Sequence, residues 1–281
     1  FGGEPTMAGT IRAIVVGGSS GMGKAAAKHI VEAGGEVLIC SRSEEKLVAA
    51  KKFIGGEARA GAVATRCLDN TDEAAVREFF ESIPEHKYNA LVVTALSRAV
   101  HGSFLSLDTN KARELFEGKL WGPWHCAKYG APRLADGGGI VFVSGVLGRR
   151  PGMNCSPLGV ANGAVEALTK SLALELGPRL RVNCLCPGFV DTERFDHLPP
   201  ERRALMLEAT ADSLPLKCVG DPMDIGEALV FLATNKFTTG TVLDVDGGHQ
   251  IRQYAMPNDL YSKLKEQAAT EGAPAAKRPR L

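Results

Sequence analysis

Residues with the types and spacing to bind a phosphorylated cofactor stand near the start of the chain. The stretch VVGGSSGMG (15–23) follows an apolar run, and its glycines are spaced as Gly17-x-x-x-Gly21-x-Gly23. Glycines let the backbone approach a pyrophosphate closely, and the N–H groups and dipole at a helix N-terminus stabilise its charge. Because such a pattern is specific only in the first strand-to-helix turn of an α/β chain, the surrounding elements decide its meaning.

The pair Ser41-Arg42 indicates which ribose the site would accept, that of NAD or that of NADP. An Asp or Glu at the end of the second strand would accept a hydrogen bond from the 2′-hydroxyl of NAD, whereas a hydroxyl and a guanidinium suit a 2′-phosphate. Lys24 adds a further positive charge. We therefore predict NADP(H) as the cofactor. The alternative is that Arg42 is only a solvated charge beside a helix.

Alternating strand and helix patterns along the chain must position these residues. The predicted strands lie near 11–17, 36–40, 62–68, 88–95, 139–144, 179–185 and 241–245. The predicted helices lie near 21–33, 44–54, 72–83, 108–131, 157–176 and 224–233, with an irregular helical segment near 192–212. Repeated βα units with apolar strands predict an α/β fold with a parallel sheet covered on both faces, the Rossmann-type doubly wound architecture.

Length and composition favour a single domain. The chain has 281 residues, of which 44% are hydrophobic, and no linker interrupts it before its last thirty residues. We expect an N-terminal lead over 1–9, a dinucleotide-binding domain over 10–249, and a flexible or subunit-covering tail over 250–281. The net charge of +1 provides no basic field for nucleic acid, and no apolar run reaches the roughly 18 residues of a membrane span. The expected partner is a small-molecule substrate.

The cysteines indicate neither a metal site nor a disulfide framework. All seven are scattered, with no C-x-x-C pair and no metal-ligand spacing to the six histidines. We therefore predict no metal, and reduced thiols in a cytoplasmic protein. The terminal Pro-Arg-Leu is a weak relative of the peroxisomal Ser-Lys-Leu address, which leaves a peroxisomal location as the lesser alternative.

Over residues 10–249 the sequence resembles the short-chain dehydrogenase/reductase family. Besides the glycine spacing, the shared features are Asp69, RVNCLCPGFVDT (181–192) and TVLDVDGGH (241–249). The resemblance implies that Asp69 contacts the adenine amino group and that residues 187–192 border the nicotinamide. The complete predicted cofactor-binding set is Gly17, Ser19, Ser20, Gly21, Met22, Gly23, Ser41, Arg42, Asp69, Asn70, Thr94, Ala95, Asn162, Pro187, Gly188, Val190 and Thr192.

The same resemblance shows that the usual catalytic residues are missing. Family members ordinarily reduce a carbonyl with a Tyr, a Lys, a Ser and an Asn, whose positions hold Leu158, Asn162, Gly145 and Lys119 here. A general acid contributes about 10²–10⁴-fold, and Leu158 cannot donate a proton. Tyr254, in the tail, could replace it only by folding back. The Asn162 amide can still hydrogen-bond the ribose, so the resemblance implies an atypical member that keeps its cofactor.

A few polar residues near the expected pocket remain as candidates for chemistry. The catalytic candidates are Ser144, Asn162 and His101. Ser144 is one residue from the expected Ser position, and His101 lies in the loop after the fourth strand. Lys119 and His125 are interpreted as surface or subunit-interface groups, and Arg149-Arg150 as a solvated pair.

Three functions are open at this point. The favoured one is an NADP(H)-dependent reductase of secondary-metabolite type that adds hydride to an iminium or similarly activated carbon, since the product amine needs no proton. The second is a cofactor-bound cyclase or isomerase that positions a reactive substrate. Some fungal alkaloid-pathway members lack the usual residues and combine iminium reduction with Diels–Alder cyclisation, and the sequence resembles them in kind. The third is a catalytically inactive NADP-binding pseudoenzyme.

Three segments outside the cofactor motifs support two further predictions. The helices at 108–131 and 157–176 have apolar spacing, and the resemblance implies that they build the interface of a homo-oligomer, a dimer or a tetramer. The segment 208–220 follows the nicotinamide-side motif and is predicted to form a lid over the substrate.

Overall fold

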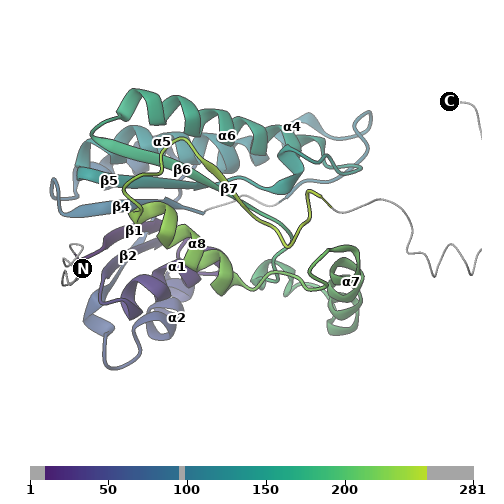
Figure 1. The fold of residues 1–281 in the computed structure, drawn as a ribbon, viewed down its shortest axis with the longest axis horizontal. Helices are drawn as coiled ribbons and strands as arrows, with labels where there is room; N and C mark the ends of the chain where they lie inside the picture. The colour runs from purple at the N-terminus through teal and green to yellow at the C-terminus, as the bar shows by residue number, and fades with distance from the viewer. Residues whose placement is uncertain (1–9, 95–98, 252–281) are drawn as a thin grey trace, which may run out of the picture. The chain divides into compact units, whose positions relative to one another are not determined.

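The computed structural model describes residues 10–94 and 99–251, and its sheet confirms the predicted α/β, doubly wound fold class. Seven parallel strands lie in the order β3-β2-β1-β4-β5-β6-β7. The chain enters the sheet at β1 and winds outward first through β2 and β3, then through β4 to β7 (Figure 1). The winding direction therefore changes between β1 and β4, where doubly wound sheets bind ligands at the carboxyl ends of the strands.

The elements follow the predicted order along the chain. The strands are β1 (Arg12–Val16), β2 (Glu36–Ser41), β3 (Val63–Cys67), β4 (Tyr88–Val93), β5 (Leu134–Val143), β6 (Leu180–Pro187) and β7 (Val242–Val245). The α-helices are α1 (Gly21–Glu32), α2 (Glu44–Gly55), α3 (Glu73–Glu81), α4 (Thr109–Phe116), α5 (Gly122–Gly130), α6 (Ser156–Leu176), α7 (Pro200–Ser213) and α8 (Pro222–Thr234). Short 3₁₀ turns include η4 (Val146–Gly148) and η5 (Glu193–Phe195), and a π-helical turn spans Glu117–Trp121.

Two hydrophobic clusters cover the two faces of the sheet. Successive side chains of a strand point to opposite faces, so Ile14 and Val16 join one cluster while Ala13 and Val15 join the other. The first cluster includes residues of α3, α5 and α6, and the second includes residues of α1, α2 and α8. Figure 1 shows α4, α5 and α6 on one side of the sheet and α1, α2 and α8 on the other. Burial on both faces explains why central strands such as β1 and β4 are largely apolar, whereas the edge strand β3 is mostly exposed.

The helix predicted over 108–131 is helical from Thr109 to Gly130, but a π-helical turn interrupts its α-helical ladder between α4 and α5. Pro123 has no N–H to donate to the carbonyl of Lys119 four residues earlier, so the regular ladder cannot continue through this turn. Gly122 follows the turn, where a Cβ would overlap the side chain of Asn70. The sequence EGKLWGPW therefore sets both the break and the close approach of α5 to the residue after β3.

Several predictions fall on parts of the chain that the structure does not describe. The lead over 1–9, Ala95, Tyr254 and the Pro-Arg-Leu terminus lie outside the described residues. The segment 208–220, which was predicted to be a lid, contains the end of α7 and the loop before α8. Among the helices of residues 10–94 and 99–251, none combines the length and the hydropathy that a membrane crossing requires.

Candidate functional site

The glycine-rich turn lies between β1 and α1, where a dinucleotide site requires it. Gly17 and Gly21 adopt φ angles of 89° and 50°, a region that side chains disfavour. A Cβ at Gly23 would overlap the Gly17 carbonyl oxygen and the Thr94 hydroxyl, which comes from the end of β4. Two glycines are therefore needed for the turn and the third for close packing against β4. Thr94, a predicted cofactor residue, lies directly beside this turn.

The carboxylate of Glu193 lies at the N-terminus of α1. The Gly21 N–H donates to Glu193 Oε2 at 2.7 Å, and the Lys24 ammonium contacts Glu193 Oε1. Burial would raise the pKa of Glu193, but hydrogen bonds from Lys24 and Gly21 outweigh it and hold this pKa below its usual range. The Glu193 carboxylate stands in for a phosphate at this helix end. The residues present therefore fit a pyrophosphate.

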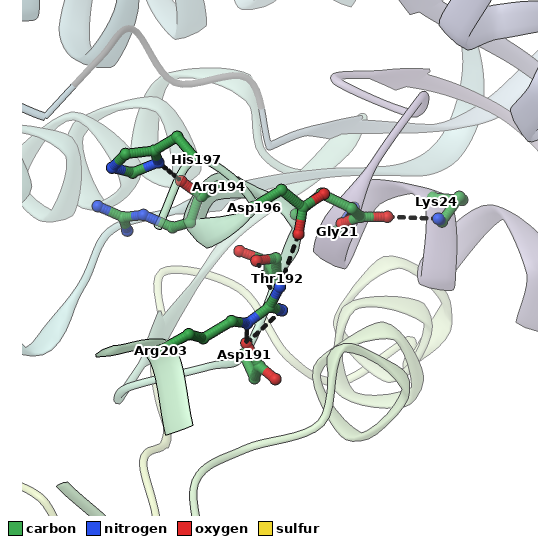
Figure 2. A network of polar contacts seen from close by, with 9 residues as sticks. Gly21, Lys24, Asp191, Thr192, Arg194, Asp196, His197 and Arg203 are labelled. Carbon is green, nitrogen blue, oxygen red and sulfur yellow. Dashed lines mark hydrogen bonds and ion pairs between the residues drawn. The ribbon is translucent and has the colours of Figure 1, made fainter. Parts of the chain in front are cut away.

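The segment that carries Glu193 is braced by a single arginine. Figure 2 shows Arg203 of α7 directed at Asp191 and Asp196 on either side of η5, with distances of 2.7 Å to both carboxylates. Because both ion pairs come from one guanidinium, the start of α7 and the whole η5 turn are held as one unit. This unit contacts the glycine-rich turn through Glu193.

The ribose and adenine side of the site is open. Arg42 is exposed and makes no hydrogen bond or ion pair within the described chain, so its guanidinium is available to a ligand. Asp69 Oδ1 accepts hydrogen bonds from the N–H and hydroxyl of Thr71 at 3.0 and 2.8 Å, which fixes the carboxylate. Asn70 is buried, and its side-chain Nδ2 has no partner in the described chain. The structure thus places the predicted residues together beyond the ends of β2 and β3.

The nicotinamide-side motif meets the glycine-rich turn. Pro187 ends β6, and a Cβ at Gly188 would lie 2.6 Å from the Asp246 carbonyl oxygen, so only glycine fits there. Val190 forms an isolated bridge with Gly220. Thr192 packs its methyl group against Gly21, 3.3 Å from where a Cβ would stand. The two predicted cofactor motifs, more than 160 residues apart, therefore lie in contact at the carboxyl end of the sheet, which is the crevice side in doubly wound folds.

The two α6 positions at which the family resemblance predicts replaced catalytic residues are both buried. Leu158 and Asn162 lie one turn apart on α6, and both are buried. The Asn162 Nδ2 atom is 2.9 Å from where a Cβ of Gly145 would stand. Asn162 Oδ1 is buried without a hydrogen-bond partner among the described residues. This unsatisfied acceptor fits a ribose hydroxyl, as the sequence predicts for Asn162.

Ser144 belongs to a buried polar network rather than standing free. Its hydroxyl donates to Glu166 Oε1 at 3.1 Å, and Glu166 Oε2 accepts from Arg149 Nε at 3.0 Å. Arg149 also donates to both carboxylate oxygens of Asp244 at 2.9 Å. The interpretation of Arg149 as half of a solvated pair is therefore wrong. Its guanidinium ties α6 to β7 beneath the end of β5.

Lys119 is the polar residue whose placement differs most from the sequence prediction. We expected a surface or interface group, but its side chain is 5% exposed. Its ammonium donates to the carbonyl oxygens of Val143 and Ser144 at 2.9 and 2.8 Å. Helical spacing could have located it, because Leu115, Lys119 and Cys126 share one buried face. The lysine was assigned to the surface from its charge alone.

The two histidines considered in the sequence lie apart from this centre. His101 is exposed, and its Nδ1 lies 3.3 Å from Cys155 Sγ at the start of α6. His125 is buried, lies against the ring of Trp121, and has its Nδ1 3.4 Å from the Asn70 carbonyl oxygen. The surface assignment of His125 is therefore wrong. In the ranges 10–94 and 99–251, no group of three or more His, Cys, Asp and Glu side chains is arranged to hold a metal ion.

Comparisons with known proteins agree with this geometry. A family model described as enoyl-(acyl carrier protein) reductase matches residues 16–250. L-fucose dehydrogenase from Oryctolagus cuniculus is 33% identical, over 95% of this chain and 94% of its own length. A small-chain dehydrogenase solved in complex with NADPH is 33% identical with a TM-score of 0.71, covering 86% of this chain and 99% of that one. The MalC reductase/Diels-Alderase from Malbranchea aurantiaca has a TM-score of 0.78 over 86% of this chain and 97% of its own, but at 23% identity it shows a shared fold alone.

Proposed function

The chain belongs to the short-chain dehydrogenase/reductase family, and from that premise we propose that it is an NADP(H)-dependent reductase of iminium or similarly activated substrates. One observation carries the proposal. The crevice keeps its nucleotide turn and nicotinamide-side motif, yet Leu158 is a buried apolar side chain at the position of the family's proton donor. The site thus retains cofactor residues while the usual acid is absent.

NADP(H) is the cofactor that the residues fit best. The glycine-rich turn and Lys24 would hold the pyrophosphate, and Arg42 would pair with the 2′-phosphate. Asn162 Oδ1, buried without a partner in the described chain, would accept a hydrogen bond from the ribose beside the nicotinamide. The solved relative that holds NADPH supports the same choice. When bound, this cofactor supplies a hydride.

An activated substrate suits the residues around the hydride. Hydride addition to a neutral carbonyl produces an alkoxide that requires a proton, and Leu158 has none to give. An iminium carbon already carries the positive charge, so hydride addition yields a neutral amine without proton transfer. The apolar wall that Leu158 forms also excludes water from a reactive electrophile.

The test uses one charged and one neutral electrophile. The protein is incubated with NADPH and either N-methyl-dihydroisoquinolinium or cyclohexanone, and loss of the reduced nicotinamide absorbance is followed. We expect turnover of the iminium salt at least about 100-fold faster than that of the ketone, since Leu158 offers no proton to the ketone oxygen at the position where the family resemblance expects the acid. Rapid ketone reduction would contradict the proposal. NADPH binding without consumption would instead favour a non-redox cyclase or an inactive cofactor-binding protein.

A further inference from the structure

A buried amino group lies at the carboxyl end of β5. The Lys119 ammonium uses two of its three N–H donors on the carbonyl oxygens of Val143 and Ser144. The third makes no hydrogen bond to any residue in the described ranges. Ligands of doubly wound sheets bind in the crevice outside the carboxyl ends of the strands. The remaining donor therefore has no partner among the described residues, at the end of the sheet where the substrate of the proposed reductase is expected.

Lys119 does not form an ion pair with any described residue. No described carboxylate lies within ion-pair distance of it, and Glu166 is already paired with Arg149. The ionisable groups that face it are Cys184 and Cys186 of β6 and Arg194 of η5. Burial lowers the pKa of Lys119 to about 8; Arg194 lowers it too, while the two thiols oppose the shift.

An unpaired buried charge destabilises a fold, so its presence in a ligand crevice indicates chemistry rather than packing. We infer that Lys119 donates the proton that turns a neutral cyclic imine into the iminium ion that accepts hydride. The inference rests on the proposed reductase function and names its substrate class, imines whose nitrogen carries no alkyl group.

The step is balanced without a further reactant. One proton passes from Lys119 Nζ to the imine nitrogen, and a hydride from the bound cofactor adds to the carbon, so that the C=N π bond is replaced by one N–H and one C–H bond. The products are a cyclic secondary amine, the oxidised cofactor and a neutral lysine. Lys119 then regains its proton from water.

The alternative is that Lys119 only clamps the end of β5, and two variants separate these roles. Lys119→Arg keeps a cation that can donate to the Val143 and Ser144 carbonyl oxygens, but a guanidinium stays protonated at neutral pH and cannot serve as the acid. Lys119→Met removes both the clamp and the acid. Lys111→Met, at an exposed position of α4, is the matched control.

The experiment compares two probes that differ only in whether the nitrogen can be protonated. These are dihydroisoquinoline and its N-methyl iminium salt, each assayed with NADPH at about pH 7.5. We expect both Lys119 variants to reduce the imine about 100-fold more slowly while the N-methyl rate changes less than about threefold. The control variant should match the wild-type protein on both probes.

The pH dependence follows from the same assignment. A lysine is a proton donor only below its pKa, so the wild-type advantage over Lys119→Met on the imine should disappear as pH rises through about 8. Protonation of the probe in solution affects both proteins equally and cancels in their ratio. The N-methyl probe should show no such change, because its nitrogen cannot take up a proton.

A second readout does not depend on turnover. In the protein without cofactor, NMR of isotopically labelled lysine side chains should show one amino group that titrates near pH 8, absent from Lys119→Met and present in Lys111→Met. Equal losses on both probes, full imine activity in Lys119→Arg, or no lysine titrating near pH 8 would overturn the inference. If the wild-type protein turns over only the N-methyl probe, the inference is overturned too. If it turns over neither probe, both the inference and the reductase proposal are overturned.

Discussion

Compared with what the family resemblance implies, an amide and an amino group have exchanged positions in this chain. The resemblance places a Lys at 162 and an Asn at 119, and the chain has Asn162 and Lys119. Both side chains are buried, on α6 and on the π-helical turn that precedes α5. The exchange keeps one amine and one amide in the crevice, but it moves the amine from α6 to the end of β5.

Arg42 carries the prediction about cofactor choice at the residue scale. Arg42→Ala should weaken NADPH binding about tenfold and leave NADH binding unchanged, because a charge-assisted hydrogen bond to a phosphate is worth about 1.5 kcal/mol or more and the 2′-hydroxyl of NADH offers no such charge. The measurement is a fluorescence titration with each cofactor. Arg12→Ala is the control, since Arg12 is exposed at the other end of β1. An equal loss for both cofactors would contradict the assignment.

The places of the predicted cofactor residues in the fold could be read from sequence because they are local. The glycine spacing lies within one turn, and Ser41, Arg42 and Asp69 lie at or just after the ends of β2 and β3, which are neighbouring strands. The partners of Lys119 and Arg149 could not be read in the same way. They lie on other elements, and Arg149, which is exposed, pairs with Asp244, 95 residues away.

At the scale of elements, η5 and α7 form a unit that contacts the cofactor turn. Arg203 binds Asp191 and Asp196, and this arrangement places Glu193 on the N-terminus of α1. A bound pyrophosphate and this carboxylate would share the same backbone donor, so they compete. The position of η5 thereby sets the affinity of the cofactor site.

Glu193→Gln should therefore tighten NADPH binding. The amide carries no charge to repel the incoming phosphates and is a weaker ligand for Gly21 N–H and Lys24, so we expect the Kd to fall about five- to tenfold, equivalent to about 1 kcal/mol. Isothermal titration calorimetry measures the change. Glu201→Gln, exposed on α7, controls for the loss of one surface charge. Unchanged or weaker NADPH binding in Glu193→Gln would show that the carboxylate does not compete.

At the scale of the whole molecule, the order of the strands could be predicted from sequence, whereas the exposure of individual side chains was harder to predict. Apolar strands alternating with helices permit few arrangements, since parallel crossovers are right-handed and consecutive strands are usually neighbours. No periodicity signals the π-helical turn between α4 and α5. Two tryptophans remain partly exposed there, Trp121 at the end of this turn and Trp124 on α5.

The predicted homo-oligomer can be tested at those tryptophans. Trp121 and Trp124 are 42% and 43% exposed and pack edge to face, with a cavity of about 500 Å³ beside them. Exposed, clustered tryptophans are typical of interface hot spots, where truncation costs about 2 kcal/mol or more. Trp124→Glu should thus weaken self-association roughly 30-fold or more, as measured by analytical ultracentrifugation over a concentration series.

Phe237→Glu is the matched control, because Phe237 is a fully exposed aromatic in the loop between α8 and β7. It should leave the oligomer intact if association depends on the α5 face rather than on apolar surface in general. Equal circular dichroism melting curves would show that both variants are folded. A monomeric wild-type protein, or equal dissociation in both variants, would place the interface elsewhere or remove it altogether. If only Trp124→Glu dissociates, the exposed face of α5 that carries Trp124 joins the subunits.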